Sequence, residues 1–189
     1  MTDKKNALGA KGADKKDISK NSDNYSAFST KNELPSSFKQ ASHWWFNFGL
    51  NVIPIAPKKK KTSRKWAYWL DGLDHKKIEK HWSKNPKHEL GAIVDHTLLI
   101  LDADSEHAIS ALYELEKAFD LEPNLIVETS KGEHHYFKRA ENTYAITRGF
   151  TTADFPEKID VKTGRSAKDG CSLIVLAPSS GKKIIINDA

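Results

Sequence analysis

Two aspartates placed two residues apart are the part of the sequence that most strongly indicates chemistry. Asp102 and Asp104 end the stretch "LLILDAD", in which four apolar residues lead directly into the pair. Side chains alternate between the two faces of a strand, so both carboxylates should project from one face with their backbones roughly 7 Å apart. Like charges this close repel each other unless a proton or a cation lies between them. Hard cations such as Mg²⁺ or Mn²⁺ bind through carboxylates together with substrate phosphates, so the pair is a candidate half-site for a phosphate substrate.

A structural explanation accounts for only one of these aspartates. A residue at the end of a strand often caps the helix that follows, and either Asp104 or Ser105 could accept a hydrogen bond from the start of that helix. Only one residue can be the cap, so the other carboxylate is left unexplained. An EF-hand is disfavoured, because the loop glycine and the later glutamate of that motif are missing.

The segment "ETSKGEHHYF", residues 128–137, is a second candidate element. Ser130, Lys131 and Gly132 form a small turn with a hydroxyl group, an ammonium group and exposed backbone N–H groups, which together suit a phosphate. The alternative is an ordinary hairpin turn with Gly132 at a positive φ.

Two adjacent histidines follow this turn on the same strand. Alternation places His134 on one face together with Tyr136, and His135 on the other face together with Phe137. Periodicity does not say which face belongs to a site, and a lone histidine is more often structural or solvated than functional. At the level of the residues alone, the choice between them stays open.

A third acid stands in "KIDVKTGRS". Ile159 and Val161 should point to one face of this strand, and Asp160 and Lys162 to the other. Asp160 is either a surface charge with an ionic partner or a third metal ligand, with Lys162 as a cation placed for phosphate.

A basic segment, residues 58–69, contains six cationic residues, which are lysines 58–61, Arg64 and Lys65. Its cations could contact nucleic-acid phosphates while Trp66, Tyr68 and Trp69 stack on bases. The alternative is a solvated loop whose tryptophans belong partly to the core.

The elements that must position these residues indicate a mixed α/β or α+β domain. Apolar residues recur at three- and four-residue steps, which predicts helices over residues 36–50, 73–86 and 105–121. The last helix should bury one face, made of Ala108, Ala111, Leu112, Leu115, Ala118 and Phe119. Strands are expected within residues 51–57, 90–104 (two strands joined by a turn at Asp95–His96), 124–129, 134–140, 157–164 and 172–180. Pro54 places the first of these at a sheet edge or a strand end rather than in the middle of a sheet, and the order lacks the βαβ alternation of a doubly wound sheet.

Composition limits the classes of protein. A chain of 189 residues suits one domain, and its net charge of +5 is compatible with a polyanionic partner. The single cysteine excludes a disulfide framework and a cysteine-rich zinc site, which fits a reducing, cytoplasmic compartment. We expect no membrane association, because no run approaches the roughly 18 apolar residues of a span and the start lacks a secretory apolar region. Residues 1–34 are expected to be a disordered polar tail, and residues 35–189 the folded domain.

Four motifs in this order resemble the primase-polymerase (Prim-Pol) domain of the archaeo-eukaryotic primase superfamily. The first is "ASHWWFNFGLNVIPIAPKKKK", and the second is the strand "LLILDAD" with its Asp-x-Asp end. The third is "ETSKGEHHYF", and the last combines "KIDVKTG" with "IVLAPSS". The resemblance spans about residues 38–180, and four motifs in register make it fairly specific.

The resemblance implies a role for each candidate residue. It implies that Asp102, Asp104 and Asp160 bind metal and form the catalytic set with His134, which contacts the phosphates of the incoming nucleotide. It implies nucleotide contacts for the turn and for nearby cations, which are Ser130, Lys131, Gly132, Lys162 and Lys61. Lys131 stands where the family often has a glycine, so this lysine either adds a phosphate contact or crowds the turn.

The implied fold is a small α/β unit packed on an RRM-like sheet, with the active site in the cleft. The implied activity is a DNA primase/polymerase that acts on nucleoside triphosphates and a single-stranded template or primer-template. Two Mg²⁺ or Mn²⁺ ions would stabilise the attacking 3′-oxygen and the leaving pyrophosphate. The sequence contains no Walker-type motif, so a replicative helicase partner would be a separate chain or a part outside this sequence.

Two rival functions use similar residues. One is a catalytically silent module that binds single-stranded or origin DNA, although the presence of all three acids argues against it. The other is a metal-dependent nuclease or phosphatase, in which water replaces the 3′-hydroxyl group.

Overall fold

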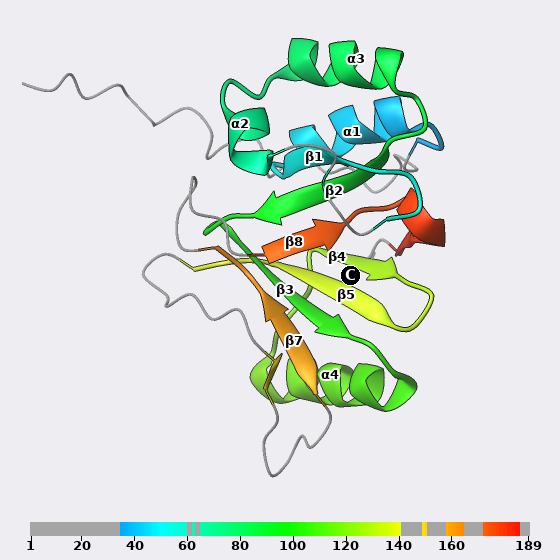
Figure 1. Ribbon diagram of the computed structural model, residues 1–189. Coiled ribbons are helices and arrows are strands. Elements are labelled where there is room, and N and C mark those ends of the chain that lie inside the picture. The colour runs from blue at the N-terminus through cyan, green and yellow to red at the C-terminus, as the bar shows by residue number, and fades with distance from the viewer. Residues whose placement is uncertain are drawn as a thin grey trace, which may run out of the picture.

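A computed structural model describes residues 35–59, 62, 65–140, 149–150, 158–164 and 172–185. The elements are α1 (Phe38–Asn47), β1 (Asn51–Ile55), α2 (Trp66–Leu70), α3 (His75–Lys84), β2 (Glu89–Val94), β3 (Leu98–Ala103), α4 (Glu106–Phe119), β4 (Leu125–Glu128), β5 (Glu133–Lys138), β6 (Gly149–Phe150), β7 (Ile159–Lys162), β8 (Ser172–Val175), the 3₁₀ turn η2 (Ser179–Gly181) and β9 (Lys183–Ile185). They form two antiparallel sheets with helices packed on them (Figure 1), which confirms the mixed α/β class predicted from the sequence.

The first sheet has the strand order β1-β2-β8 and carries helices α1, α2 and α3 on one side (Figure 1). The edge position of β1 agrees with the proline in that strand. Helix α1 begins after Ser37, whose side chain accepts a hydrogen bond from the first turn, and its end is followed by Gly49 at φ 94°. Trp45, Ile78 and Trp82 are completely or almost completely buried, so the predicted apolar stripes of α1 and α3 do face the core.

The second sheet has the strand order β6-β7-β3-β5-β4-β9, so β3 lies between β7 and β5. Strands β2 and β3 were both predicted, but they belong to different sheets. The chain passes between the sheets through a turn in which Asp95 Oδ1 accepts hydrogen bonds from the backbone and the hydroxyl group of Thr97. This turn joins the end of β2, in the first sheet, to the start of β3, in the second sheet.

The two faces of β3 have different neighbours. Leu98 and Ile100 belong to the large core that includes α1, α3 and the first sheet, whereas Leu101 and Ala103 pack with α4. Figure 1 shows α4 against the opposite face of the second sheet. Asp102 alternates with Leu101 and Ala103, so it shares the face that is directed toward the first sheet.

Helix α4 departs from the prediction in its last turn. Ser105 accepts a hydrogen bond from the N–H of Ala108 and is the N-cap. The predicted face is buried as far as Leu115, but Ala118 is exposed and Phe119 is 66% exposed. The predicted burial of Ala118 and Phe119 was wrong, because the apolar contacts between α4 and the second sheet end at Leu115. Glu116 is buried instead, where it pairs with a histidine of β5.

Four short elements were not predicted, and one of them is η2, which begins within the range 172–180 where a strand was expected, although β8 ends at Val175. Helix α2 lies in the segment interpreted as a basic loop, and it is fixed by Trp69, which is buried and donates its indole N–H to Val52 O. Strands β6 and β9 contain only two and three residues, too few to show alternation. Across the ranges given above, no helix has the length and apolar character needed to cross a membrane.

Several expectations concern residues outside the described ranges. These are the tail over residues 1–34, and Lys60, Lys61 and Arg64 of the basic segment. In the described part of that segment, Tyr68 is 76% exposed, whereas Trp69 belongs to the core. Of these two aromatic side chains, only Tyr68 is accessible for stacking.

Candidate active site

Three neighbouring strands place polar side chains in one row across the second sheet. In the antiparallel register, Asp102 of β3 is directly opposite His134 of β5 on one side and Asp160 of β7 on the other. Directly opposite residues have Cβ atoms about 4.5–5.5 Å apart. Strand pairing therefore gathers three groups that are far apart in the sequence.

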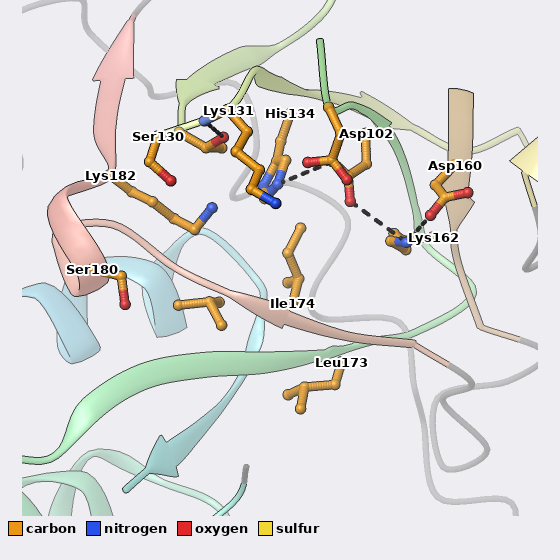
Figure 2. Close-up of a pocket in the computed structure, with 13 residues that line it drawn as sticks. Asp102, Ser130, Lys131, His134, Asp160, Lys162, Leu173, Ile174, Ser180 and Lys182 are labelled. Carbon is orange, nitrogen blue, oxygen red and sulfur yellow. Dashed lines mark hydrogen bonds and ion pairs between the residues drawn. The ribbon is translucent and has the colours of Figure 1, made fainter. Parts of the chain in front are cut away.

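This row forms part of the wall of a pocket of about 340 Å³ between the two sheets (Figure 2). Seven of the predicted residues line it, which are Asp102, Asp104, Ser130, Lys131, His134, Asp160 and Lys162. The opposite wall comes from β8 and η2. Of the predicted site residues in the described ranges, Gly132 is the one that does not line the pocket.

Asp102 is the most enclosed of the three acids, with a side chain that is 13% exposed. Its Oδ1 atom lies 3.4 Å from His134 Nε2, and its Oδ2 atom lies 3.5 Å from Lys162 Nζ. Burial alone would raise the pKa of Asp102, but His134 and Lys162 outweigh it and hold the pKa below its ordinary value. Asp102 is therefore ionised at neutral pH.

Asp102 and His134 lie close enough to form an ion pair, but their atoms do not have the geometry of a hydrogen bond. Asp102 Oδ1 and His134 Nδ1 are both buried, and neither has a hydrogen-bond partner among the described residues. Buried polar atoms of this kind are uncommon in folded proteins and call for an explanation. A ligand that enters the pocket could supply partners to both.

Asp160 is held by two lysines, one on each side of it in the sequence. Lys158 Nζ lies 2.8 Å from Oδ1, and Lys162 Nζ lies 3.0 Å from Oδ2. Residues two apart on a strand share a face, so the sequence "KIDVK" itself places both cations beside the acid. Lys158 first, and then Lys162, hold the pKa of Asp160 below its ordinary value.

Asp104 follows the end of β3 and is exposed at the pocket. Because Ser105 caps α4, the carboxylate of Asp104 is not used by the helix. The capping explanation thus applies to Ser105 and leaves both aspartates at the pocket.

The β4–β5 turn was interpreted either as a phosphate-binding turn with exposed N–H groups or as a hairpin turn with Gly132 at a positive φ, and its backbone matches neither. Gly132 has no positive φ; its constraint is space, because a Cβ atom there would lie 1.7 Å from Ala103 O. The N–H groups of Lys131 and Gly132 donate to Thr129 Oγ1, at 3.2 and 3.0 Å. These two N–H groups are therefore engaged within the turn, and its free contributions to the pocket are the side chains of Ser130 and Lys131.

His135 lies on the opposite face from His134 and is fully buried. Its Nδ1 atom is 2.5 Å from Glu116 Oε1 of α4, and its Nε2 atom is 2.9 Å from Glu133 Oε2. Burial would lower the pKa of His135, but the two carboxylates outweigh it and raise the pKa above its ordinary value. Tyr113 donates to the same Glu133 oxygen, and burial followed by this carboxylate raises its pKa to about 12.

The sequence interpretation missed the residues on the opposite wall. They are Leu173, Ile174 and Val175 of β8, together with Ser180 and Lys182 around η2. Figure 2 shows the side chain of Lys182 directed toward Ser130 and Lys131. A signal was present, because "SSGKK" contains the same residue types, hydroxyl, glycine and lysine, as the turn "TSKG".

The acids suit Mg²⁺ or Mn²⁺ in donor type, since all three offer carboxylate oxygens. Within the described ranges, however, no three His, Cys, Asp or Glu side chains are already grouped to hold a metal ion. Lys162 lies between two of these acids and contacts Asp102 and Asp160 at once. Asp102 Oδ1 is buried and makes no hydrogen bond to the residues described, so the donor set fits a divalent cation that would contact this oxygen.

Comparison with known proteins bears on this arrangement. A search of curated proteins found no match to the chain. The family described as "Bifunctional DNA primase/polymerase, N-terminal" matches residues 42–185, which include both sheets and every described residue of the pocket. The chain therefore belongs to the Prim-Pol family.

Proposed function

We propose that this chain is a template-directed nucleotidyltransferase that makes or extends primers in DNA replication. One observation carries the proposal beyond membership of the family. A single pocket has carboxylates of β3 and β7 on one side and lysines from two turns on another, as a triphosphate and its cations require. Its substrates would be nucleoside triphosphates and a single-stranded template or primer-template.

The acids would hold the divalent cations. Asp102, Asp104 and Asp160 supply hard oxygen ligands, and the depressed pKa values of Asp102 and Asp160 keep both ionised at neutral pH. When bound, Mg²⁺ or Mn²⁺ supplies charge stabilisation for the attacking 3′-oxygen and the departing pyrophosphate.

The cationic side chains would bind the triphosphate. Attack of the 3′-oxygen on the α-phosphorus breaks the bond to pyrophosphate and spreads negative charge over the phosphoryl oxygens. Lys131 and Lys182 line the pocket as positive groups, which favour the charge that develops, and His134 lines it with a ring nitrogen that can bond to a phosphate oxygen. Ser130 and Ser180 add hydroxyl donors from the same two turns.

The wall formed by β8 suits the base or the sugar. Leu173, Ile174 and Val175 line the pocket, and Leu173 is 37% exposed. Ligand pockets commonly combine an apolar surface with a few polar groups that fix orientation. We assign the polar walls to the triphosphate and this apolar wall to the remainder of the nucleotide.

A primer-extension assay tests the proposed function. The protein is incubated with a labelled primer-template and either ribo- or deoxynucleoside triphosphates, with Mg²⁺ or Mn²⁺, and also without primer. Extension by the parent and none by Asp102→Asn is expected. Asp120→Asn is the matched control, because Asp120 is exposed at the end of α4 with φ 51°, where asparagine is tolerated.

The same assay identifies the rival functions. A shifted but unextended primer would indicate a DNA-binding module without catalysis. A shortened primer would indicate a nuclease, and either result would contradict the proposal.

A further inference from the structure

Lys162 connects two of the candidate metal ligands. Its ammonium nitrogen lies 3.5 Å from Asp102 Oδ2 and 3.0 Å from Asp160 Oδ2, on adjacent strands (Figure 2). The side chain is 23% exposed, so this contact is partly shielded from water. The register places Lys162 opposite Ile100, diagonally across from Asp102, from where its long side chain reaches back between the two acids.

The two acids need a cation in the metal-free protein. Asp102 and Asp160 are a directly opposite pair, and like charges in that position destabilise a sheet. One ammonium group between them replaces this repulsion with two attractions. Lys162 thus performs, in the absence of metal, the electrostatic role that a divalent cation would otherwise perform.

A divalent cation and this ammonium group cannot use the same oxygens together. Mg²⁺ binds carboxylate oxygens at about 2.0–2.1 Å, and a cation that contacts both Oδ2 atoms would take the space that the ammonium group now fills. Two positive groups at this separation would also repel each other. Lys158 differs in geometry, because it contacts only Oδ1 of Asp160 and its side chain is 68% exposed.

We propose that Lys162 is a built-in counter-ion that holds Asp102 and Asp160 together in the metal-free protein and is displaced when a divalent cation binds. This inference rests on the proposed function, because it takes these acids to be the metal site. It assigns Lys162 as a positioning residue that sets the affinity for metal. Metal binding here is an exchange of cations, and its affinity is reduced by the stability of the lysine bridge.

Binding of Mn²⁺ to the full chain in nucleotide-free buffer tests the exchange. The free Mn²⁺ signal is measured by electron paramagnetic resonance for the parent, Lys162→Met, Lys162→Arg and Lys158→Met. Lys162→Met should bind Mn²⁺ about tenfold more tightly than the parent, a factor within the usual range of coupling between two ligands. Lys162→Arg, which keeps the charge, and Lys158→Met, which removes a lysine that does not bridge, should stay close to the parent.

Thermal unfolding in EDTA provides a second readout. Lys162→Met should unfold at a lower temperature than the parent, because the two carboxylates then repel each other. Added Mn²⁺ should raise its unfolding temperature more than that of the parent, since ligand stabilisation grows with affinity. Equal or weaker Mn²⁺ binding by Lys162→Met would overturn the inference.

A measurement on the parent protein covers the case in which Lys162→Met does not fold. Reductive methylation of Lys162, followed by mass spectrometry, should be slow in EDTA and faster with Mg²⁺, because the displaced amine becomes accessible. Unchanged labelling would then overturn the inference.

Failure of the inference can be told from failure of the proposed function. Asp102→Asn should abolish Mn²⁺ binding, which identifies the site that is measured. Primer extension with unchanged Mn²⁺ affinity in Lys162→Met would reject only the counter-ion role. Tighter Mn²⁺ binding by that variant without any extension by the parent would support the counter-ion and reject the polymerase.

Discussion

At the scale of single residues, the charge on Asp102 is set by neighbours on two other strands. His134 and Lys162 keep its pKa below the ordinary value despite burial. A carboxyl group with a lower pKa in the folded state stabilises the fold at pH values above its unfolded pKa, about 3.9. That contribution is lost as the pH falls through the folded pKa, and Asp160 behaves in the same direction.

Asp102→Asn should separate activity from stability. Primer extension should fall by at least about 10²-fold, as expected when a group that stabilises developing charge is removed. At neutral pH the unfolding temperature should fall modestly, because the amide keeps the shape of the side chain but loses the charge interactions with His134 and Lys162. Below pH 4 the variant should lose less stability than the parent, as measured by circular dichroism melts from pH 7 to pH 3. Parallel pH profiles would show that Asp102 has no depressed pKa.

Gly132→Ala should damage the fold beside the site. The added Cβ atom would lie 1.7 Å from Ala103 O, a backbone atom that cannot move without shifting β3 next to Asp102. We expect a loss of roughly 3 kcal/mol or more in the free energy of unfolding, at the upper end of the cost of overpacking. Chemical denaturation measures it, and a wild-type midpoint would show that the turn can adjust.

Lys131→Gly is the matched change one residue earlier in the chain. Lys131 is exposed, so replacing it by glycine should cost no more than about 1 kcal/mol in the free energy of unfolding. The position in this turn that requires glycine is therefore residue 132, and the lysine at residue 131 does not crowd it.

At the scale of elements, strand β5 connects the pocket to α4. His134 is directed into the pocket, and His135 is bracketed by Glu116 and Glu133 on the other face. One strand thus carries a candidate ligand for phosphate and, next to it, a charged group that ties α4 to the sheet.

The two histidines should have opposite effects when replaced. His134→Ala should raise the KM for nucleotide and lower the rate, with little change in stability. His135→Ala should leave the buried carboxylate of Glu116 without its histidine partner, whereas Glu133 keeps Tyr113, and should cost about 3–5 kcal/mol. Steady-state extension kinetics and urea denaturation of both variants measure the two effects. The reverse pattern would mean that His135 contacts the nucleotide and that His134 serves stability.

The stabilising effect of His135 should depend on pH. Its pKa is higher in the folded state, so the contribution is complete below the unfolded pKa of about 6.5 and is lost as the pH rises through the folded value. The difference in unfolding free energy between the parent and His135→Gln should therefore be largest at pH 6 and smaller at alkaline pH. A difference that grows with pH would contradict a charged His135.

Periodicity explains which of these elements could be predicted from the sequence. The alternation in "LLILDAD" and "HHYF" predicted faces that the structure confirms, since those strands pair over their full length. Helix α2 and strands β6 and β9 could not be predicted, because two to five residues show no period and tertiary contacts such as that of Trp69 stabilise α2. The lysine bridge between Asp102 and Asp160 depends on strand order, which no local pattern contains.

At the scale of the whole molecule, the pocket exists because two sheets meet. Strand β8 completes the first sheet beside β2, and the chain then returns through η2 to β9 at the edge of the second sheet. This path carries Lys182 to the pocket opposite the β4–β5 turn (Figure 2). Sequence motifs identified the wall formed by β3, β5 and β7. The opposite wall became clear only from the path of the chain from β8 through η2 to β9.

If Lys131 and Lys182 bind one triphosphate from two turns, replacing both should impair nucleotide use more than DNA binding. Lys131→Gln and Lys182→Gln should each raise the KM for nucleotide by roughly 10- to 150-fold, because a hydrogen bond to a charged group typically contributes about 1.5–3 kcal/mol. Their effects should not add in the double variant, because both lysines contact the same anion. Lys183→Gln is the control, since Lys183 is exposed next to Lys182 and does not line the pocket. Extension kinetics at saturating primer-template measure each KM, and fluorescence anisotropy measures the affinity for DNA. An unchanged KM in Lys182→Gln, or an equal effect of Lys183→Gln, would remove the η2 turn from the nucleotide site and leave the triphosphate to the β4–β5 turn alone.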